Sequence, residues 1–247
     1  MEITSVNNEL VKECVKLQQK KYRQSTGKFL LEGYKAIKEA CDFGIKLEHV
    51  FVENSKIEQY KFIQNNIIET NSAVLKKIST TESAPEAVAI GVQKDYQIEN
   101  IGNKVVLLED IKDAGNLGTI IRSSVAFGAE GIVLYGDCID LYNPKVVRAA
   151  VGNLWKIPVI HITDFAQLEE KFENYERIAT LPRTKKYLKS FKPVQKMLLM
   201  FGSEANGLSD ELIKFSTDDL KIEMNKEVES LNLATSVSVV LYELFMK

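Results

Sequence analysis

Short apolar runs alternate with amphipathic segments along most of the chain. In the first half, the pattern predicts a helix over residues 5–22, with an apolar stripe that includes Leu10, Val11 and Cys14. It then predicts strands at residues 29–32, 49–53, 67–69 and 87–92, and helices at residues 34–41, 57–64 and 72–78. Ser72 is a suitable N-cap for the last of these helices. Residues 1–93 are therefore expected to form a small α/β domain.

The second half begins after a polar stretch at residues 94–103, which we interpret as a linker. Strands are predicted from apolar runs at residues 105–108, 132–134, 157–160, 177–181, 196–202 and 220–224. Helices are predicted between these strands at residues 119–127, from Asn143 and Pro144 onwards, and at residues 164–172. A further helix is predicted after the last strand, over the largely apolar C-terminal segment. Because strands and helices alternate, residues 104–247 are expected to form a parallel sheet covered on both faces. From this pattern alone, the sheet is expected to be unknotted.

Polar loops follow three of the predicted strands. After the strand at residues 105–108, the glycine-rich segment 113–118 is expected to turn sharply, and Arg122 lies in the second turn of the helix that follows. The other two loops follow the strands at residues 196–202 and 220–224 and read SEANGL and NKEVESLN. Ligands of parallel sheets bind at the carboxyl ends of the strands. We therefore expect the three loops to meet at one edge of the sheet.

Composition and charge indicate a globular protein, in which 45% of the 247 residues are hydrophobic. The formal net charge of -2 argues against a protein that coats nucleic acid without specificity. Two segments nevertheless carry basic side chains and no acid, residues 16–28 with five and residues 177–196 with seven. Such segments are typical of nucleic-acid-binding surfaces, although solvated helix faces also carry basic runs.

Several classes of function are disfavoured. Cys14, Cys41 and Cys138 are widely separated, which argues against disulfides and zinc clusters and fits a reducing cytoplasm. No apolar run approaches the ~18 residues of a membrane span, and the first residues show no apolar run after a basic start, so neither a membrane span nor export is expected. His49 and His161 are the only histidines and lie beside no motif Asp or Ser, so a hydrolase triad or a histidine metal site is not expected. Neither common phosphate-binding loop is present, which favours a cofactor without phosphate.

Three motifs follow one another in the second half of the chain and read NLGTIIR followed by AFG, then FGSEANGL, then IEMNKEVESLNLATSVSVVLYE. Together they resemble the motifs of the SpoU (TrmH) family of RNA ribose methyltransferases. The resemblance covers residues 104–247 and implies an α/β catalytic domain of the SPOUT superfamily, in which about residues 202–247 form a deep trefoil knot, and a homodimer. It replaces the unknotted sheet as our expectation. The segment FLLEGYKAIKEA is similar to the substrate-binding domain of SpoU-like enzymes, which resembles small RNA-binding ribosomal proteins.

The resemblance also implies a cofactor and a substrate. S-adenosylmethionine is expected as the methyl donor and structured RNA as the acceptor, ribosomal RNA more than transfer RNA. Asn116, Arg122, Glu204 and Asn232 match the catalytic positions of the motifs. We expect Arg122 to bind the phosphate beside the target ribose, because a guanidinium stays protonated and is a poor base. Glu204 is expected either to order Arg122 or to accept the proton of the hydroxyl, and the base is left unassigned.

The cofactor is expected to contact strand ends and the loops that follow them. The residues concerned are Thr180, Leu181, Gly202, Gly207, Ile222, Ser230 and Leu231. Gly202 and Gly207 allow close approach of a backbone, and Ser230 is also a suitable N-cap for the last helix. Ala114 and Ala234 stand where the family motifs carry proline and a second serine. We expect these two departures to affect rate and specificity more than activity.

Two other functions stay open from the sequence. One is a non-catalytic RNA-binding protein that retains the fold, against which the complete set of motif residues argues. The other is a different doubly wound enzyme, such as a nucleotide hydrolase, against which the missing phosphate loop argues.

Overall fold

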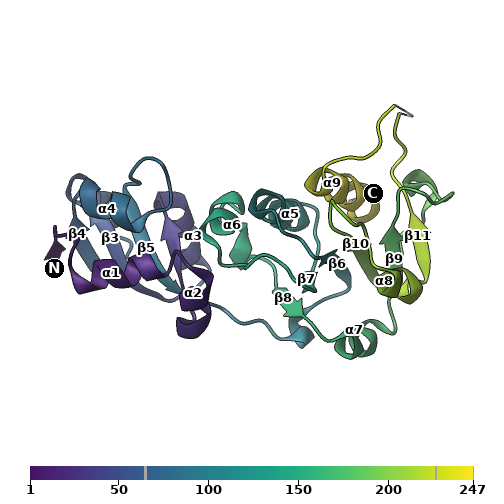
Figure 1. The fold of residues 1–247 in the computed structure, drawn as a ribbon, viewed down its shortest axis with the longest axis horizontal. Coiled ribbons are helices and arrows are strands. Elements are labelled where there is room, and N and C mark those ends of the chain that lie inside the picture. Colours follow the sequence, from purple (N-terminus) through teal and green to yellow (C-terminus); the bar gives the residue numbers. More distant parts are fainter. Residues whose placement is uncertain (64–65, 226, 247) are drawn as a thin grey trace. The chain divides into compact units, whose positions relative to one another are not determined.

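The structure is a computed structural model that describes residues 1–63, 66–225 and 227–246 (Figure 1). Contacts between residues divide it into two compact units. Unit 1 comprises Met1–Lys94 together with Asp140–Trp155, and unit 2 comprises Asp95–Ile139 and the residues from Lys156 onwards. The border at Lys94 lies at the start of the polar stretch that we interpret as a linker. The assignment of residues 140–155 to unit 1 is a feature that the sequence did not predict.

Unit 1 contains a five-stranded mixed sheet. Its strands, in spatial order, are β1 (Glu2–Ile3), β4 (Ile67–Thr70), β3 (Leu47–Glu53), β5 (Ala87–Val92) and β2 (Lys28–Glu32). The first three are parallel to one another, and β5 runs antiparallel to both of its neighbours. The four strands predicted for this part of the chain are therefore present, and β1 is a strand that the sequence did not predict.

The helices of unit 1 differ from the prediction in three places. The helices are α1 (Glu9–Lys16), α2 (Lys20–Thr26), α3 (Tyr34–Asp42), α4 (Ser72–Ile78) and α6 (Pro144–Ala149), with 3-10 helices η1 (Asn54–Tyr60) and η3 (Asn153–Trp155). The helix predicted over residues 5–22 is divided, because the carbonyls of Leu17 and Gln18 accept hydrogen bonds from the Arg23 side chain. In place of the helix predicted at residues 57–64 the structure has η1, which begins and ends earlier, and residue 64 lies outside the described residues. The N-cap of α4 is Asn71 and not Ser72.

Segment 140–155 is held in unit 1 by charge and by aromatic packing. Arg23 is only 2% exposed, and its guanidinium contacts Asp140 Oδ2 through Nε at 2.6 Å and Nη2 at 2.5 Å. The Phe29 ring lies 4.7 Å from that of Tyr142 and 5.4 Å from that of Trp155, between ring centroids. A paired charge is tolerated in a protein interior, whereas an unpaired one is costly. These contacts explain why the segment leaves its sequence neighbours in unit 2.

Unit 2 contains the parallel sheet that the alternation predicts. Its six strands, in spatial order, are β11 (Asp218–Leu220), β9 (Glu176–Thr180), β10 (Met197–Phe201), β6 (Lys104–Glu109), β7 (Gly131–Tyr135) and β8 (Val159–Ile162). All neighbouring pairs are parallel. β11, the last strand along the sequence, lies earlier than the predicted range 220–224. Its pairing with β9 ends at Leu220, and Lys221 pairs instead with Tyr187.

Helices cover both faces of this sheet (Figure 1). They are α5 (Ala114–Ala126), α7 (Phe165–Phe172), α8 (Asp210–Phe215) and α9 (Leu233–Phe245), with 3-10 helices η2 (Ile98–Asn100) and η4 (Leu188–Ser190). α5 contacts α9 through the Ser123 and Ser238 hydroxyls at 2.7 Å, and α7 contacts α8 through the rings of Phe165 and Phe215. The sequence did not predict α8. No helix in the described part of the chain is long and apolar enough to cross a bilayer.

Candidate functional site

The first loop of the site is shorter than predicted, because α5 begins at Ala114 and not at Thr119. Asp113 is the N-cap, and its Oδ1 accepts a hydrogen bond from the Asn116 backbone N–H at 2.7 Å. This bond satisfies one of the free N–H groups of the first turn, so the glycines of the segment become helical despite their low helix propensity. Asn116 therefore lies in the first turn of α5, at the carboxyl end of the sheet.

Three of the predicted catalytic residues lie together. The Asn116 side-chain amide donates a hydrogen bond to Glu204 Oε1, and the Asn232 amide donates to Asn116 Oδ1 at 2.9 Å. The three residues follow β6, β10 and β11, so the loops after these strands meet as predicted. The hydrogen bonds form a chain from Asn232 through Asn116 to Glu204, which we call the amide–carboxylate chain.

Asn232, which begins the amide–carboxylate chain, is itself fixed by its role as a helix cap. Asn232 is the N-cap of α9, and its Oδ1 accepts a hydrogen bond from the Thr235 N–H at 3.2 Å. The prediction that Ser230 is the N-cap is therefore wrong, because α9 begins at Leu233 and the asparagine reaches the free N–H. Ser230 is exposed in the loop before the cap. The same asparagine thus holds both the helix start and the amide–carboxylate chain.

Glu204 is held on one side and free on the other. Its Oε1 accepts the Asn116 amide, and within residues 1–63, 66–225 and 227–246 its Oε2 makes no hydrogen bond. The loop that carries it is anchored by Glu109 at the end of β6, which is 7% exposed and accepts the Ser209 N–H at 2.7 Å. Sequence reasoning missed Glu109, although an acid that ends a buried apolar run is a usable signal. Glu204 can accept a hydrogen bond from a ligand.

Arg122 is not part of the amide–carboxylate chain. It lies on α5 six residues beyond Asn116, which is roughly 9 Å further along the helix axis. The side chain is exposed and forms no hydrogen bond or ion pair with the described residues. No contact joins it to Glu204, so this structure lends no support to an ordering of Arg122 by that carboxylate. The guanidinium is available to an anionic ligand.

The predicted cofactor residues lie at the ends of neighbouring strands. Thr180 ends β9, and its hydroxyl donates a hydrogen bond to the Met200 carbonyl of β10 at 2.8 Å. The Leu181 N–H donates to the Leu220 carbonyl of β11 at 2.9 Å. Gly202 comes directly after β10, and Ile222 lies two residues after β11. These positions therefore belong to three adjacent strand ends.

The two glycines of the FGSEANGL loop are needed for different reasons. A Cβ on Gly202 would lie 1.9 Å from the carbonyl carbon of Gly207 and 2.1 Å from the Leu208 nitrogen. Gly207 has a φ of +70°, and a Cβ there would meet nothing within 4 Å. The close backbone approach predicted at Gly202 is therefore made by the loop itself, and Gly207 makes the left-handed turn that closes it.

The strand ends suit the adenosine part of S-adenosylmethionine. Leu181, Ile222 and Leu231 are half-buried, whereas Ala179 and Leu220 behind them are fully buried. Partly exposed apolar side chains beside loop backbone offer a surface for an adenine ring and polar groups for its edge. No cluster of His, Cys, Asp and Glu suited to a metal ion occurs among the described residues.

Comparisons with known proteins agree with this geometry. Residues 103–242 match the SpoU rRNA Methylase family, and residues 8–89 match the MRM3-like substrate binding domain. The chain is 32% identical to an uncharacterized tRNA/rRNA methyltransferase of Synechocystis sp., with 98% of this chain and 92% of that protein covered. It is 26% identical to a 23S rRNA (guanosine(2553)-2'-O)-methyltransferase of Bacillus subtilis, with 98% of each covered.

A solved structure gives the same result. The AdoMet-bound rRNA methyltransferase from Sinorhizobium meliloti superimposes with a TM-score of 0.89 at 28% identity, covering 98% of this chain and 96% of that one. The motifs, the parallel sheet and the match over residues 103–242 together show that the chain belongs to the SpoU rRNA methylase family.

Proposed function

We propose that this protein transfers the methyl group of S-adenosylmethionine to a ribose 2′-hydroxyl of ribosomal RNA. Membership of an rRNA methylase family supports the reaction class, and relatives from Bacillus subtilis and Streptomyces viridochromogenes are named 23S rRNA 2'-O-methyltransferases. The observation that carries the proposal is the amide–carboxylate chain, which brings Asn116, Glu204 and Asn232 to the carboxyl ends of the sheet. A ligand of a parallel sheet binds at that edge.

The cofactor, when bound, supplies a methyl group on a positively charged sulfur that a hydroxyl oxygen can attack. Thr180, Leu181, Gly202, Gly207, Ile222, Ser230 and Leu231 are proposed to bind it. The half-buried Leu181, Ile222 and Leu231 suit the adenine ring. The loop of Gly202 and Gly207 and the exposed Ser230 offer polar groups to the rest of the molecule.

Arg122 is proposed to bind the phosphate next to the target ribose. The guanidinium is exposed and has no partner in the described part of the chain, so it loses no internal bond when it binds. Its forked N–H groups match phosphate oxygens in pairs. A phosphate held there limits the positions that the adjacent 2′-hydroxyl can take, and such restriction supplies much of the rate of a group transfer.

Glu204 is proposed to accept the hydrogen of the 2′-hydroxyl. Its Oε2 is free to do so, whereas Oε1 is held by Asn116, which fixes the direction of the carboxylate. When the cofactor is bound, this carboxylate would take the proton that the 2′-hydroxyl loses on methylation and pass it to solvent. Asn116 and Asn232 act by positioning, because they hold Glu204 through the amide–carboxylate chain.

A homodimer is proposed through α9. Val239 and Tyr242 are exposed by 39% and 51% and lie three residues apart on α9, which puts them on one helix face, and Met246 at the C-cap is exposed by 56%. Exposed apolar side chains on one face are typical of a surface that a partner covers. A second copy of the chain is the proposed partner.

A trefoil knot is proposed for the C-terminal segment. The Lys221 N–H donates to the Lys186 carbonyl at 2.9 Å, and the Leu188 N–H donates to the Lys221 carbonyl at 2.8 Å. The chain after β11 thus runs along the connection between β9 and β10, which supports its passage through that loop.

The N-terminal domain is proposed to bind RNA, in agreement with its match to a substrate binding domain. A cytoplasmic site of action is proposed, because all three cysteines are free.

Mapping of 2′-O-methyl groups tests the proposed reaction. Total RNA from cells with and without this protein is compared at nucleotide resolution. We expect one or more ribose methyl groups in ribosomal RNA to depend on the protein. A dependent methyl group on a base, or only in transfer RNA, contradicts the reaction or the substrate that we propose.

Arg122→Ala tests the site within the same assay. We expect methyl transfer to fall by about a hundredfold or more, because the phosphate is no longer positioned, while cofactor affinity measured by calorimetry is retained. Arg122→Lys is the matched control and should keep part of the rate, because it keeps the charge but not the fork. A rate of Arg122→Ala close to that of the natural protein refutes the role.

A further inference from the structure

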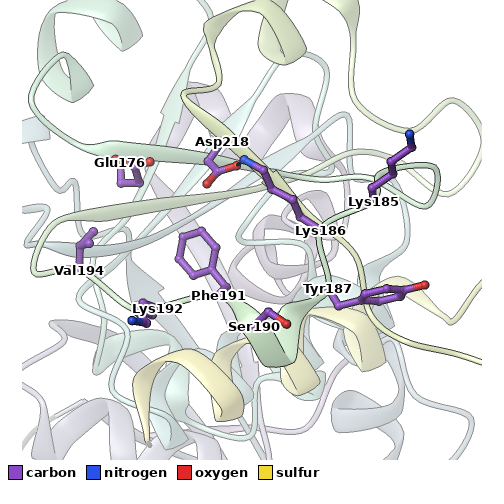
Figure 2. Close-up of a pocket in the computed structure, with 9 residues that line it drawn as sticks. All are labelled: Glu176, Lys185, Lys186, Tyr187, Ser190, Phe191, Lys192, Val194 and Asp218. Atoms are coloured by element: carbon purple, nitrogen blue, oxygen red, sulfur yellow. Dashed lines mark hydrogen bonds and ion pairs between the residues drawn. The ribbon is translucent and has the colours of Figure 1, made fainter.

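The connection between β9 and β10 borders a cavity of about 420 Å³ in unit 2 (Figure 2). Its lining comes mainly from this connection, and Glu176 of β9 and Asp218 of β11 complete it. The volume is within the range of ~300–1,000 Å³ that is usual for small-molecule sites. None of the residues proposed to bind the cofactor lines it. A ligand of this cavity would therefore be a molecule other than S-adenosylmethionine.

The centre of the cavity is apolar and its edge is polar. Figure 2 shows the ring of Phe191 between Glu176 and Asp218 on one side and Lys192 and Ser190 on the other. The Glu176 carboxylate makes no side-chain hydrogen bond or ion pair with the residues that the structure describes. An aromatic face next to a free acceptor suits a planar ring that carries N–H donors, such as a nucleobase.

Two lysines at the cavity carry uncompensated charge. Lys185 and Lys192 are exposed, and neither forms an ion pair with any described residue. Lys186, by contrast, contacts Asp218. Proteins that bind single-stranded nucleic acid combine basic side chains, which contact phosphates, with aromatic rings, on which bases stack. The charge that is free to bind an anion therefore resides on Lys185 and Lys192.

Tyr187 presents an ordered aromatic ring beside these lysines. The backbone on both sides of it is hydrogen-bonded to Lys221, and the Lys221 Nζ lies 4.8 Å from the ring centroid. The Lys189 Nζ lies 5.7 Å from the same ring. The residue is nevertheless 38% exposed. A ring held on a paired backbone and open to solvent is suited to stacking with a base.

We propose that this cavity binds an unstacked nucleotide of the RNA substrate, away from the methylated ribose. One base lies against Phe191 with its N–H groups toward Glu176, an adjacent base stacks on Tyr187, and the phosphates contact Lys185 and Lys192. Glu176 begins β9, and Thr180 ends it at the edge of the sheet where methyl transfer is proposed. Glu176 therefore lies about 13 Å from that edge. The inference rests on the proposed function, because it assumes that RNA is the substrate.

The double variant Lys185→Ala/Lys192→Ala tests the phosphate contacts. The probe is unmodified 23S ribosomal RNA transcribed in vitro, and its affinity for the full-length protein is measured at several salt concentrations. We expect weaker binding and a slope of log affinity against log salt that is smaller by about 1.4, which corresponds to two lost contacts with single-stranded phosphates. Lys171→Ala/Lys214→Ala removes the same charge elsewhere in unit 2 and is expected to leave the slope at the natural value.

Tyr187→Ala tests the stacking contact. We expect RNA affinity to fall by about 5- to 150-fold, the range for loss of one stacked base, and Tyr187→Phe to restore most of it. In methylation assays the KM for RNA should rise, and cofactor affinity by calorimetry should stay at the natural value. Equal loss in Tyr187→Phe and Tyr187→Ala contradicts stacking.

The outcomes separate this inference from the proposed function. If the natural protein methylates ribose and both the lysine and tyrosine variants bind RNA with natural affinity and salt slope, the cavity does not bind RNA and the inference is overturned. If the variants lose RNA affinity but no ribose methyl group depends on the protein, the proposed reaction is wrong while the RNA-binding cavity stands.

Discussion

Replacing Gly202 by alanine should disrupt the loop that carries Glu204. The added Cβ would lie 1.9 Å from the Gly207 carbonyl carbon, 2.1 Å from its oxygen and 2.1 Å from the Leu208 nitrogen. All three atoms belong to the backbone, so no side chain can rotate away to make room. The loop as a whole must move, and Leu208 behind it is 8% exposed and packs in the core of unit 2.

The cost of this displacement can be worked out from core overpacking, which destabilises proteins by about 1–3 kcal/mol. Because backbone and not side chain is displaced, we expect the upper end, about 3 kcal/mol. For a chain of this size each kcal/mol lowers the melting temperature by about 2–4 °C, which gives about 6–12 °C. We also expect cofactor affinity to fall at least about tenfold, since the loop borders the proposed adenosine site.

Thermal unfolding followed by circular dichroism and cofactor binding followed by calorimetry measure the two effects. Gly207→Asn is the matched control, because nothing lies within 4 Å of the added carbon and asparagine tolerates a φ of +70°. It should melt close to the natural protein. A Gly202→Ala variant that melts within about one degree of the natural protein and binds the cofactor equally well would refute the reasoning.

Three further predictions concern other parts of the molecule. Asp140→Asn leaves the buried Arg23 guanidinium without its carboxylate and should lower the free energy of unfolding of unit 1, measured with urea, by about 3–5 kcal/mol. A decrease below about 1 kcal/mol contradicts a buried ion pair. Asn116→Asp places a second carboxylate beside that of Glu204, which Asn116 now holds. Because like charges repel, the rate of single-turnover methyl transfer should fall at least about tenfold at neutral pH. A rate equal to that of the natural protein argues against the amide–carboxylate chain. Burial raises the pKa of the Cys14 thiol to about 12 from 9.0, so Ellman's reagent at pH 8 should modify the half-buried Cys41 first, and reaction of Cys14 at the same rate contradicts its burial. Since the unfolded Cys14 thiol ionises at lower pH than the folded one, its contribution to stability is complete below about pH 9 and should decline as the pH rises towards 12.

Local pattern was sufficient for most of the elements. Apolar runs predicted five of the six strands of the parallel sheet, whereas β11 lies before its predicted range. Asn143 before Pro144 predicted the start of α6, where the Asn143 side chain caps the helix. These features depend on side chains within a few residues of one another. Helix starts were less reliable where two cap residues compete, as at Asn71 and Ser72, because only the geometry of the turn decides which oxygen reaches the free N–H.

Tertiary contacts decided the features that involve distant residues. The sequence placed polar loops after three strands, and the motifs identified Asn116, Glu204 and Asn232, but only folding showed that one hydrogen-bonded chain joins them and that Arg122 stands outside it. Likewise, no local signal shows that Asp140 pairs with Arg23 in unit 1, because 117 residues separate the two and the pairing depends on the desolvation of both charges. The sequence by itself determined most of the strands, the start of α6 and the family, since these depend on side chains close together in the chain. The assembly of the site and the membership of residues 140–155 in unit 1 depend on contacts that exist only after the chain has folded.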